Sequence, residues 1–144
     1  MRILVQRPGT FDGTCNQFCG LQHAWMRLRI VGDPPDQFNA WMQQQASPAS
    51  PTGSRGEQIF QQQSCMACHT IRGLSGATGT VGPDLTHFGS RTTIGAGVED
   101  NTPDNLRAWI NDPQRIKPGV LMPAFNSLSA DDMSALVTYL EGLK

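Results

Sequence analysis

From residue 54 onwards, polar and hydrophobic residues alternate with the period of an amphipathic helix, and this pattern predicts three helices. The first begins at Ser54, because Ser54-Arg55-Gly56-Glu57 has the Ser-x-x-Glu pattern of a capping box. The second begins at Thr102-Pro103 and ends before Pro113. The third begins at Ser129 and continues to about residue 142. The hydrophobic positions that share one helical face are Leu106, Trp109 and Ile110 in the second helix, and Met133, Leu136, Val137 and Leu140 in the third.

The first part of the chain follows a different pattern. Residues 1–6 and 25–31 are rich in aliphatic side chains and predict two strands. A short helix is expected after Asp33-Pro34-Pro35-Asp36, with Phe38, Trp41 and Met42 on one face. Residues 46–53 are mostly small residues, serine and proline, which is typical of a linker. The predicted parts are residues 1–45, a linker at 46–53 and a helical domain at 54–144.

Composition and charge narrow the classes of function. The net charge of the 144 residues is −1, divided into +1 for residues 1–50 and −2 for the rest. Such small net charges give no reason to expect electrostatic binding to nucleic acid or to anionic lipid. The sequence has no long apolar run and no signal-peptide pattern, so the chain by itself is expected to be soluble. Arg91 and Lys117 are expected to be ordinary solvated charges.

The segment Cys65-Met66-Ala67-Cys68-His69 has the C-x-x-C-H pattern of covalent haem attachment. In this pattern the two thiols add to the vinyl groups of the porphyrin, and the adjacent imidazole binds the iron. The sequence therefore predicts haem c, with Cys65 and Cys68 as attachment residues and His69 as an axial ligand.

Two other uses of the C-x-x-C pair fit less well. A thioredoxin-like redox pair follows a buried strand, whereas Phe60-Gln61-Gln62-Gln63-Ser64 is too polar for one. A zinc site would have to borrow Cys15 and Cys19, but zinc ribbons favour two C-x-x-C pairs and this upstream pair is spaced C-x-x-x-C.

Met122 is the favoured second axial ligand. Met66 lies inside the attachment motif, on the same side of the ring as His69, and Met133 has the spacing of a core residue. Met122 follows Pro118 and precedes Pro123 in an apolar segment whose restricted backbone can direct one thioether at the iron. His/Met ligation raises the reduction potential and leaves no open position for a substrate. Packing in the core is the alternative role for Met122.

Soft metal ligands are concentrated in the N-terminal part. The pattern Cys15-x-x-x-Cys19-x-x-x-His23-x-x-Met26 offers two thiolates, an imidazole and a thioether, a mixture that selects copper. Two bridging sulfurs can hold two copper ions together. All four cysteines of the chain belong to metal motifs, so disulfides are not expected in the native state, although Cys15 and Cys19 could pair without copper.

With the flanking residues 7–14 and Gly20, this loop resembles the ligand loop of cytochrome c oxidase subunit II. The resemblance implies a binuclear copper centre bridged by the two cysteines. It also implies that residues 1–45 are the C-terminal remnant of a cupredoxin-like copper-binding β-sandwich. The ligands implied by the resemblance are Cys15, Cys19, His23, Met26 and the backbone carbonyl of Gln17.

The helical part resembles class I cytochromes c. The glycine-rich stretch at residues 73–97 is expected to be irregular. Within it, Gly82-Pro83-Asp84-Leu85 is similar to the turn whose proline carbonyl accepts the hydrogen bond of the haem histidine. The resemblance implies that Pro83 orients His69 and raises its basicity. The expected fold is therefore mainly α, a class I cytochrome c domain preceded by a partial β-sandwich.

Two departures from the subunit II family bear on the copper site. The family usually has a glutamate, which serves a magnesium ion, at the position of Gln17. The family's second copper histidine comes from a strand before the first cysteine, and only fourteen residues precede Cys15 here. His87 is a poor substitute and is interpreted as a surface or propionate-side histidine. We expect the C-terminal part of a longer subunit, with an incomplete copper site and weakly packed strands.

The order of the two motifs resembles that of bacterial haem-copper oxidases whose subunit II carries a fused cytochrome c domain. The resemblance implies electron transfer from an external donor, such as a cytochrome c, through haem c to copper, and then to oxygen reduction in subunit I. No residue of this chain is expected to be catalytic. The implied location is the outer, periplasmic face of the bacterial cytoplasmic membrane, with membrane contact through a preceding N-terminal region and other subunits. The alternatives are the copper and haem region of a nitrous oxide reductase, and a free-standing carrier cytochrome c with a degenerate N-terminus.

Overall fold

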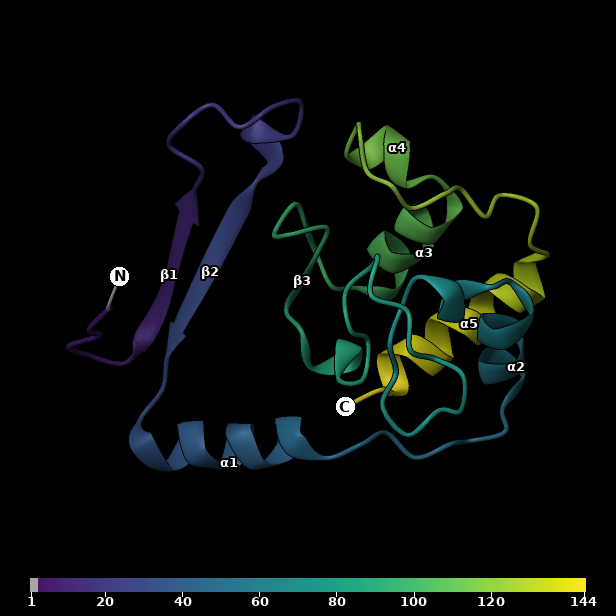
Figure 1. Ribbon diagram of the computed structural model, residues 1–144, viewed down its shortest axis with the longest axis horizontal. Helices are drawn as coiled ribbons and strands as arrows, with labels where there is room; N and C mark the ends of the chain where they lie inside the picture. The colour runs from purple at the N-terminus through teal and green to yellow at the C-terminus, as the bar shows by residue number, and fades with distance from the viewer. Residues whose placement is uncertain (1–2) are drawn as a thin grey trace.

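The helices predicted from residue 54 onwards are present and pack together (Figure 1). The computed structural model describes residues 3–144. Helices α2 (Arg55–Gln62), α3 (Pro103–Asn111) and α5 (Ala130–Gly142) begin and end close to the predicted residues. Pro113, predicted only as a stop, begins the one-turn helix α4 (Pro113–Ile116), because the Asp112 side chain accepts a hydrogen bond from the Arg115 N–H at 3.3 Å. We call residues 54–144 the helical module.

A side-chain hydroxyl caps each of the three longer helices of the helical module. Ser54, Thr102 and Ser129 each accept a hydrogen bond from the N–H three residues later. The capping box at Ser54 is only half formed, because the Glu57 carboxylate accepts from the N–H and hydroxyl of Thr52, at 2.6 and 3.0 Å. The buried Glu57 therefore ties the segment before α2 to the first turn of that helix.

The core of the helical module lies where α2 crosses α5. Gly56 is buried at this crossing, and a Cβ atom there would overlap the Ala135 carbonyl oxygen and the Tyr139 Cβ. The rings of Phe60 and Tyr139 are tilted against each other, with their centroids 6.1 Å apart. Met133 is buried, which confirms its predicted core role. The other buried aliphatic and aromatic side chains include Ile59, Ile71, Leu74, Leu85, Phe88, Ile94, Leu106, Ile110, Leu136, Val137, Leu140 and Leu143.

An antiparallel ribbon forms the N-terminal part. Strand β1 (Gly9–Thr14) pairs with β2 (Arg27–Gly32), so the strand predicted at residues 25–31 is nearly correct. The strand predicted at residues 1–6 is wrong for residues 3–6, which have no regular structure, while residues 1–2 lie outside the described part of the chain.

The reason for this error is the loop that joins the two strands. The Cys15 N–H donates to the Met26 carbonyl at 3.0 Å, so the ladder continues up to the loop and the paired strand must adjoin it. Across the ribbon, Arg29 Nε lies 2.7 Å from Asp12 Oδ1, and this ion pair favours the same register.

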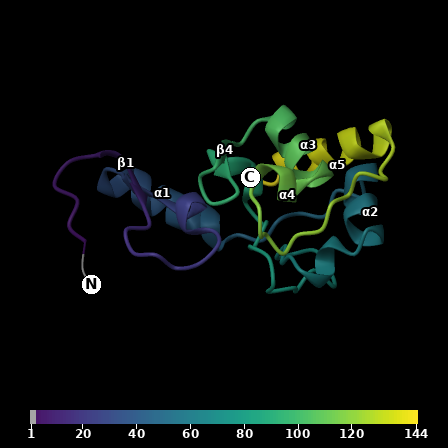
Figure 2. The same cartoon turned by 90° about the horizontal axis from the view of Figure 1, so that it is seen from above.

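Apolar side chains of the ribbon and of α1 (Pro35–Ala46) face solvent. Helix α1 matches the predicted short helix, but Phe38 and Trp41, whose rings stack at 5.8 Å, remain 44% and 49% exposed. The ribbon and α1 lie to one side of the helical module (Figure 2). Within residues 3–144 the ribbon has two strands, so a cupredoxin-like sandwich stays a prediction.

The glycine-rich stretch at residues 73–97 is largely irregular, as predicted. It contains a 3-10 turn (Phe88–Ser90) and β3 (Thr93–Ile94), which pairs with β4 (Glu99–Asp100).

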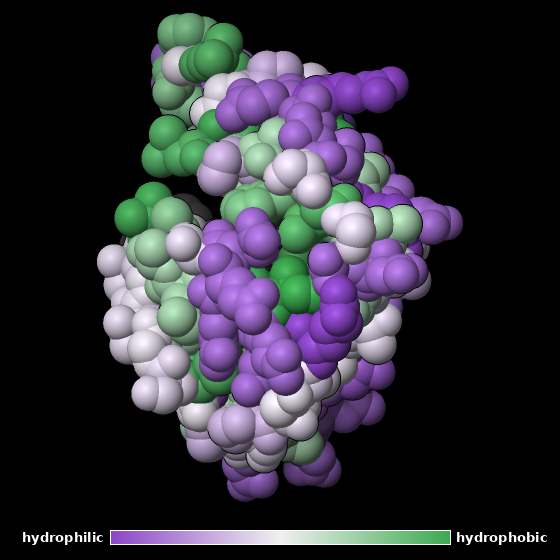
Figure 3. Space-filling view, turned by 90° about the vertical axis from the view of Figure 1, so that its right-hand side faces the viewer, coloured by the Kyte–Doolittle hydropathy of each residue, from purple (hydrophilic) through white to green (hydrophobic). Residues whose placement is uncertain are grey.

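On the side of the module near α2, a narrow apolar strip is exposed between polar residues (Figure 3). In the described part of the chain, no helix combines the length and the hydrophobicity needed to cross a membrane.

The helix crossing generates a stability prediction. Gly56→Ala should lower the free energy of unfolding by about 1–3 kcal/mol, because the new methyl group overlaps the backbone of α5. Gly142→Ala is the matched control, since a Cβ at Gly142 meets no atom within 4 Å. Chemical denaturation of both variants checks this, and equal stability of the two would contradict the close crossing.

Candidate functional site

The C-x-x-C-H residues lie in a tight turn directly after α2. Ser64 has a left-handed backbone, with φ of 60°, which ends the helix and reverses the chain. The 3-10 helix η2 (Cys65–Ala67) follows, and the N–H groups of Cys68 and His69 donate to the Cys65 carbonyl at 3.2 and 3.0 Å. This turn brings two half-buried thiols and a half-buried imidazole together beside the core.

A glycine-proline turn holds the His69 imidazole. Its Nδ1 lies 2.8 Å from the Pro83 carbonyl oxygen, which can only accept, so Nδ1 carries the proton and Nε2 keeps a lone pair for a metal. Gly82 lies against the ring, since a Cβ there would be 2.6 Å from Nδ1 and 2.9 Å from Nε2. The Gly82 N–H also donates to the Cys68 carbonyl at 2.7 Å. The predicted contact between Pro83 and His69 is therefore present.

The Asp84 side chain stabilises the turn that contains Pro83 by binding Thr86 and Arg72. Its Oδ1 accepts from the Thr86 N–H and hydroxyl at 2.8 and 2.5 Å, and its Oδ2 lies 3.6 Å from Arg72 Nε. Burial acts to raise the pKa of Asp84, but the Thr86 hydrogen bonds and the charges of Arg72 and Arg91 outweigh it, so the pKa lies below its usual value. The Asp84 carboxyl is therefore ionised at neutral pH.

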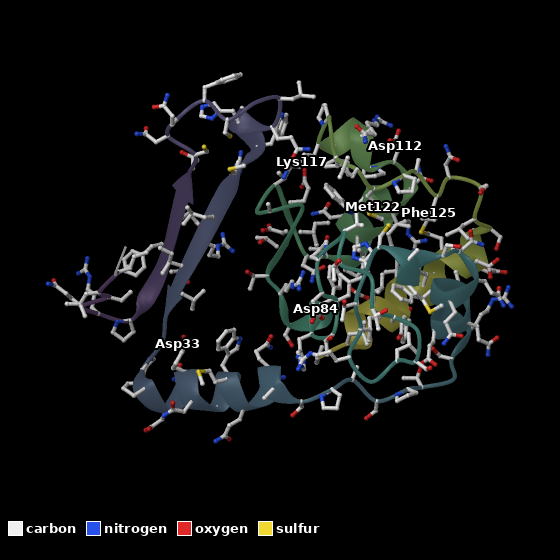
Figure 4. All side chains as sticks on the ribbon, in the orientation of Figure 1. Asp33, Asp84, Asp112, Lys117, Met122 and Phe125 are labelled. Atoms are coloured by element: carbon white, nitrogen blue, oxygen red, sulfur yellow. The ribbon has the colours of Figure 1, made fainter. Side chains whose placement is uncertain are left out.

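Met122 lies in the loop at residues 117–128, which we call the Met122 loop. Met122 and Phe125 are half-buried and pack against the core of the helical module (Figure 4). The Phe125 N–H donates to the Ile110 carbonyl, in the last turn of α3, at 3.0 Å. Gln114 shapes the loop, since its Oε1 accepts from the Gly119 N–H at 2.9 Å and its Nε2 donates to the Val120 carbonyl. The loop thus has a defined backbone that presents Met122 to the module.

The soft ligands predicted in the N-terminal part converge at the tip of the ribbon. We call residues 15–26 the thiolate loop. Cys15 Sγ lies 3.5 Å from Cys19 Sγ and 3.1 Å from the Gln17 carbonyl oxygen. Cys19 Sγ lies 3.8 Å from His23 Nδ1 and 3.9 Å from Met26 Sδ. Among residues 3–144, Cys15, Cys19 and His23 form the one group of three or more Cys, His, Asp or Glu side chains whose ligand atoms cluster within 4.8 Å.

The thiols of both clusters are free. Burial raises the pKa of Cys65 to about 11, and the adjacent Cys15 thiol raises the pKa of Cys19. Cys65 and Cys19 are therefore protonated at neutral pH in the free chain. Binding of a metal cation at Cys19 would displace its proton.

Two side chains expected at the surface are buried. His87 is 7% exposed, and its Nε2 lies 2.9 Å from the Ser47 carbonyl oxygen, so the surface interpretation is wrong and His87 anchors the segment before α2. Lys117 is 6% exposed, and its Nζ donates to the Gly95 carbonyl at 2.8 Å. Burial lowers the pKa of Lys117, which is therefore not an ordinary solvated charge.

Comparison with known families agrees with this geometry. The family model for cytochrome c matches residues 53–144. The chain belongs to the cytochrome c family. Membership implies haem c, and the residues fit that group, because two thiols and a histidine with a free Nε2 share one turn.

The chain is also similar to oxidase subunits over nearly its whole length. It is 39% identical to cytochrome c oxidase subunit 2 of Alkalihalophilus pseudofirmus over 100% of this chain, and 37% identical to that of Bacillus sp. strain PS3 over 94%. It is 32% identical to the Bacillus subtilis subunit over 93%. The chain spans 42%, 40% and 39% of the lengths of these three relatives.

Sequence reasoning missed several residues that shape this cytochrome c site. Thr86 and Arg72 hold Asp84, and Gln114 holds the Met122 loop. Nothing in the local pattern marks Arg72 or Gln114, because Asp84 is distant from Arg72 in the sequence and the partners of Gln114 are backbone atoms. Thr86 lies two residues after Asp84, so its hydrogen bonds are local and could have been expected from an Asp-x-Thr turn. Gly82 carried a signal, since a glycine beside the predicted proline turn indicates a close approach.

The close approach at Gly82 can be tested. Gly82→Ala should push the His69 ring away from Pro83, lower the free energy of unfolding by about 1–3 kcal/mol and reduce the share of chains that carry covalent haem. A pyridine haem assay and chemical denaturation measure the two effects, with Gly142→Ala as the control. Normal haem content together with unchanged stability would contradict the role given to Gly82.

Proposed function

We propose that this chain transfers electrons from an external donor, through haem c, to copper in a cytochrome c oxidase that reduces oxygen. The observation that carries the proposal is the convergence of five predicted copper ligands in the same chain as a cytochrome c domain. The relatives that are similar over nearly the whole chain bear the name cytochrome c oxidase subunit 2, which supports an oxidase over a nitrous oxide reductase.

The helical module would hold the haem. Cys65 and Cys68 would supply the thioether links, and His69, through Nε2, and Met122, through its thioether, would bind the iron. Pro83 keeps the imidazole oriented and makes it a stronger ligand, since its carbonyl accepts the Nδ1 proton. Bound in this way, the haem supplies a one-electron redox couple without an open position for substrate.

The thiolate loop would hold copper. Cys15 and Cys19 are close enough for their sulfurs to share a metal, and His23, Met26 and the Gln17 carbonyl lie beside them. Thiolate, imidazole and thioether are soft ligands that favour copper. The bound copper would supply the second redox centre. The second histidine of a binuclear site has no candidate in this cluster among the described residues, so we expect fewer than two coppers per chain.

The proposed partners follow from the same assignment. Subunit I of the oxidase would receive the electrons, and a soluble or membrane-bound donor such as a cytochrome c would supply them. The proposed location is the outer, periplasmic face of the bacterial cytoplasmic membrane. The chain carries electrons, and the oxygen-reducing site belongs to subunit I. Residues 1–45 would be part of a cupredoxin-like copper domain, joined by residues 46–53 to the cytochrome c domain.

Metal analysis tests the assignment of two centres. The haem-loaded chain, given copper, should contain one iron and bind copper, whereas Cys19→Ser should keep the iron and lose the copper, because one thiolate is removed. Asn16→Ser is the control, since it changes a neighbouring side chain outside the ligand set. A wild-type chain with iron alone would favour a free-standing carrier cytochrome and contradict the copper assignment.

The role of Met122 is tested separately. Met122→Ala should abolish the weak far-red absorption band of methionine-ligated ferric haem and lower the reduction potential, because the thioether ligand is lost. Met42→Ala is the control, since Met42 is half exposed on α1. Persistence of the band in Met122→Ala would exclude this methionine as a ligand.

A further inference from the structure

We propose that the thiolate loop is seated on a fixed face of the helical module, formed by the turns at residues 95–97 and 118–119, and that electrons cross this contact within one chain. The inference rests on the proposed function and deepens it, because it identifies the surface that faces the copper ligands.

The first part of this face is the turn before Met122. Gly119 has a left-handed backbone, with φ of 85°, and a Cβ there would be 2.7 Å from Leu21 Cδ2. Gln22 Nε2 donates to the Pro118 carbonyl at 3.5 Å. Leu21 and Gln22 directly precede the copper ligand candidate His23, and Gly119 precedes Met122 by three residues. The contact therefore brings the thiolate loop directly against the Met122 loop.

The second part of the face is a left-handed turn. Gly95, Ala96 and Gly97 have φ values of 62°, 63° and 81°, and the Val98 N–H closes the turn on the Ile94 carbonyl at 3.1 Å. A left-handed alanine is sterically costly, and such conformations persist where the surroundings impose them. This turn meets the ribbon just beyond Met26, since a Cβ at Gly97 would be 3.2 Å from Arg27 Cβ.

Two side-chain hydrogen bonds anchor the ribbon and its loop to the helical module, one from Gln22 to the Pro118 carbonyl and one from Arg29 to Thr92. Arg29, held by its ion pair with Asp12, donates from Nη1 to the Thr92 hydroxyl at 3.1 Å. Between the anchors lie clefts of about 400 and 520 Å³, one beside Trp25 and α3, the other between the ribbon and the turn at 95–97. Few side chains therefore hold the contact, and a single unfavourable charge in it should suffice to open it.

The segment that joins the two parts is also held in place. Arg72 donates to the Gln45 and Ala46 carbonyls at 2.5 and 3.1 Å, at the end of α1. The Ala49 N–H donates to the Arg72 carbonyl at 2.8 Å, and Ser47 accepts from His87. Residues 46–53 have the composition of a flexible linker, yet they are bound along the surface of the helical module. A bound junction favours one fixed arrangement over diffusion on a tether.

The fixed arrangement is tested on the haem-loaded full chain. Nuclear magnetic relaxation should give the ribbon and the helical module the same rotational correlation time in the wild type. Leu21→Asp should shorten the correlation time of the ribbon, because it places a charge next to Gly119 in the contact. The side chain of Leu21 is 79% exposed, so the substitution should not unfold either part of the chain. Leu4→Asp, an equal change at an 85% exposed leucine, should have no effect. Unchanged signals from the helical module verify folding, and independent tumbling of the wild-type ribbon would overturn the proposal.

A second measurement separates this proposal from the proposed function. In the copper-loaded chain, photoreduction of the haem should be followed by electron transfer to copper, slower by at least about tenfold in Leu21→Asp if the seated population falls to a tenth. An unchanged rate in Leu21→Asp, with both metals bound, would overturn the seated contact and leave the proposed function intact. No transfer in the wild type with both metals bound would refute the proposed function, while the relaxation data would still decide whether the loop is seated.

Discussion

The crossing of α2 and α5 at Gly56 is the constraint on which the helical module depends. Because Gly56 has no side chain, the backbone of α2 lies directly on α5, and the Phe60 and Tyr139 rings fill the space beside it. The end of α2 leads through the left-handed Ser64 into the turn that carries Cys65. The position of the haem-binding turn is therefore set by a contact between two backbones, which varies less than a contact between long side chains.

Main-chain carbonyls lie beside both groups of proposed metal ligands. Pro83 accepts from His69, and this selects the tautomer with a free Nε2. In the thiolate loop the Gln17 carbonyl, itself a proposed copper ligand, lies 3.1 Å from Cys15 Sγ. Carbonyls of a constrained turn cannot rotate away as side chains can, so the ligands are oriented before any metal arrives. Preorganisation of this kind suits electron transfer, which proceeds best when the ligand geometry changes little between oxidation states.

Local signals in the sequence account for the helices and the ligand sets, and distant contacts account for the errors. Ser54, Thr102 and Ser129 predict helix starts because a cap acts within three residues. The spacing of Cys15 and Cys19 likewise predicts their proximity. By contrast, the burial of His87 and Lys117 depends on Ser47 and Gly95, which lie 40 and 22 residues away. The strand predicted at residues 3–6 is wrong for a different reason, because strand pairing is decided by the loop that closes the ribbon.

The bound junction at residues 46–53 has a consequence for how the chain withstands proteolysis. Proteases cut segments that can leave the surface and enter a cleft as an extended strand. Here the Gln45, Ala46 and Ser47 carbonyls are engaged by Arg72 and His87, and Ala49 lies against Gly73, where a Cβ would overlap its carbonyl oxygen. Residues 46–53 are mostly serine, proline and small residues, a composition that predicts a site of proteolytic cleavage. The hydrogen bonds of this stretch make it a protected part of the surface, so the two metal-binding parts should resist separation by limited digestion.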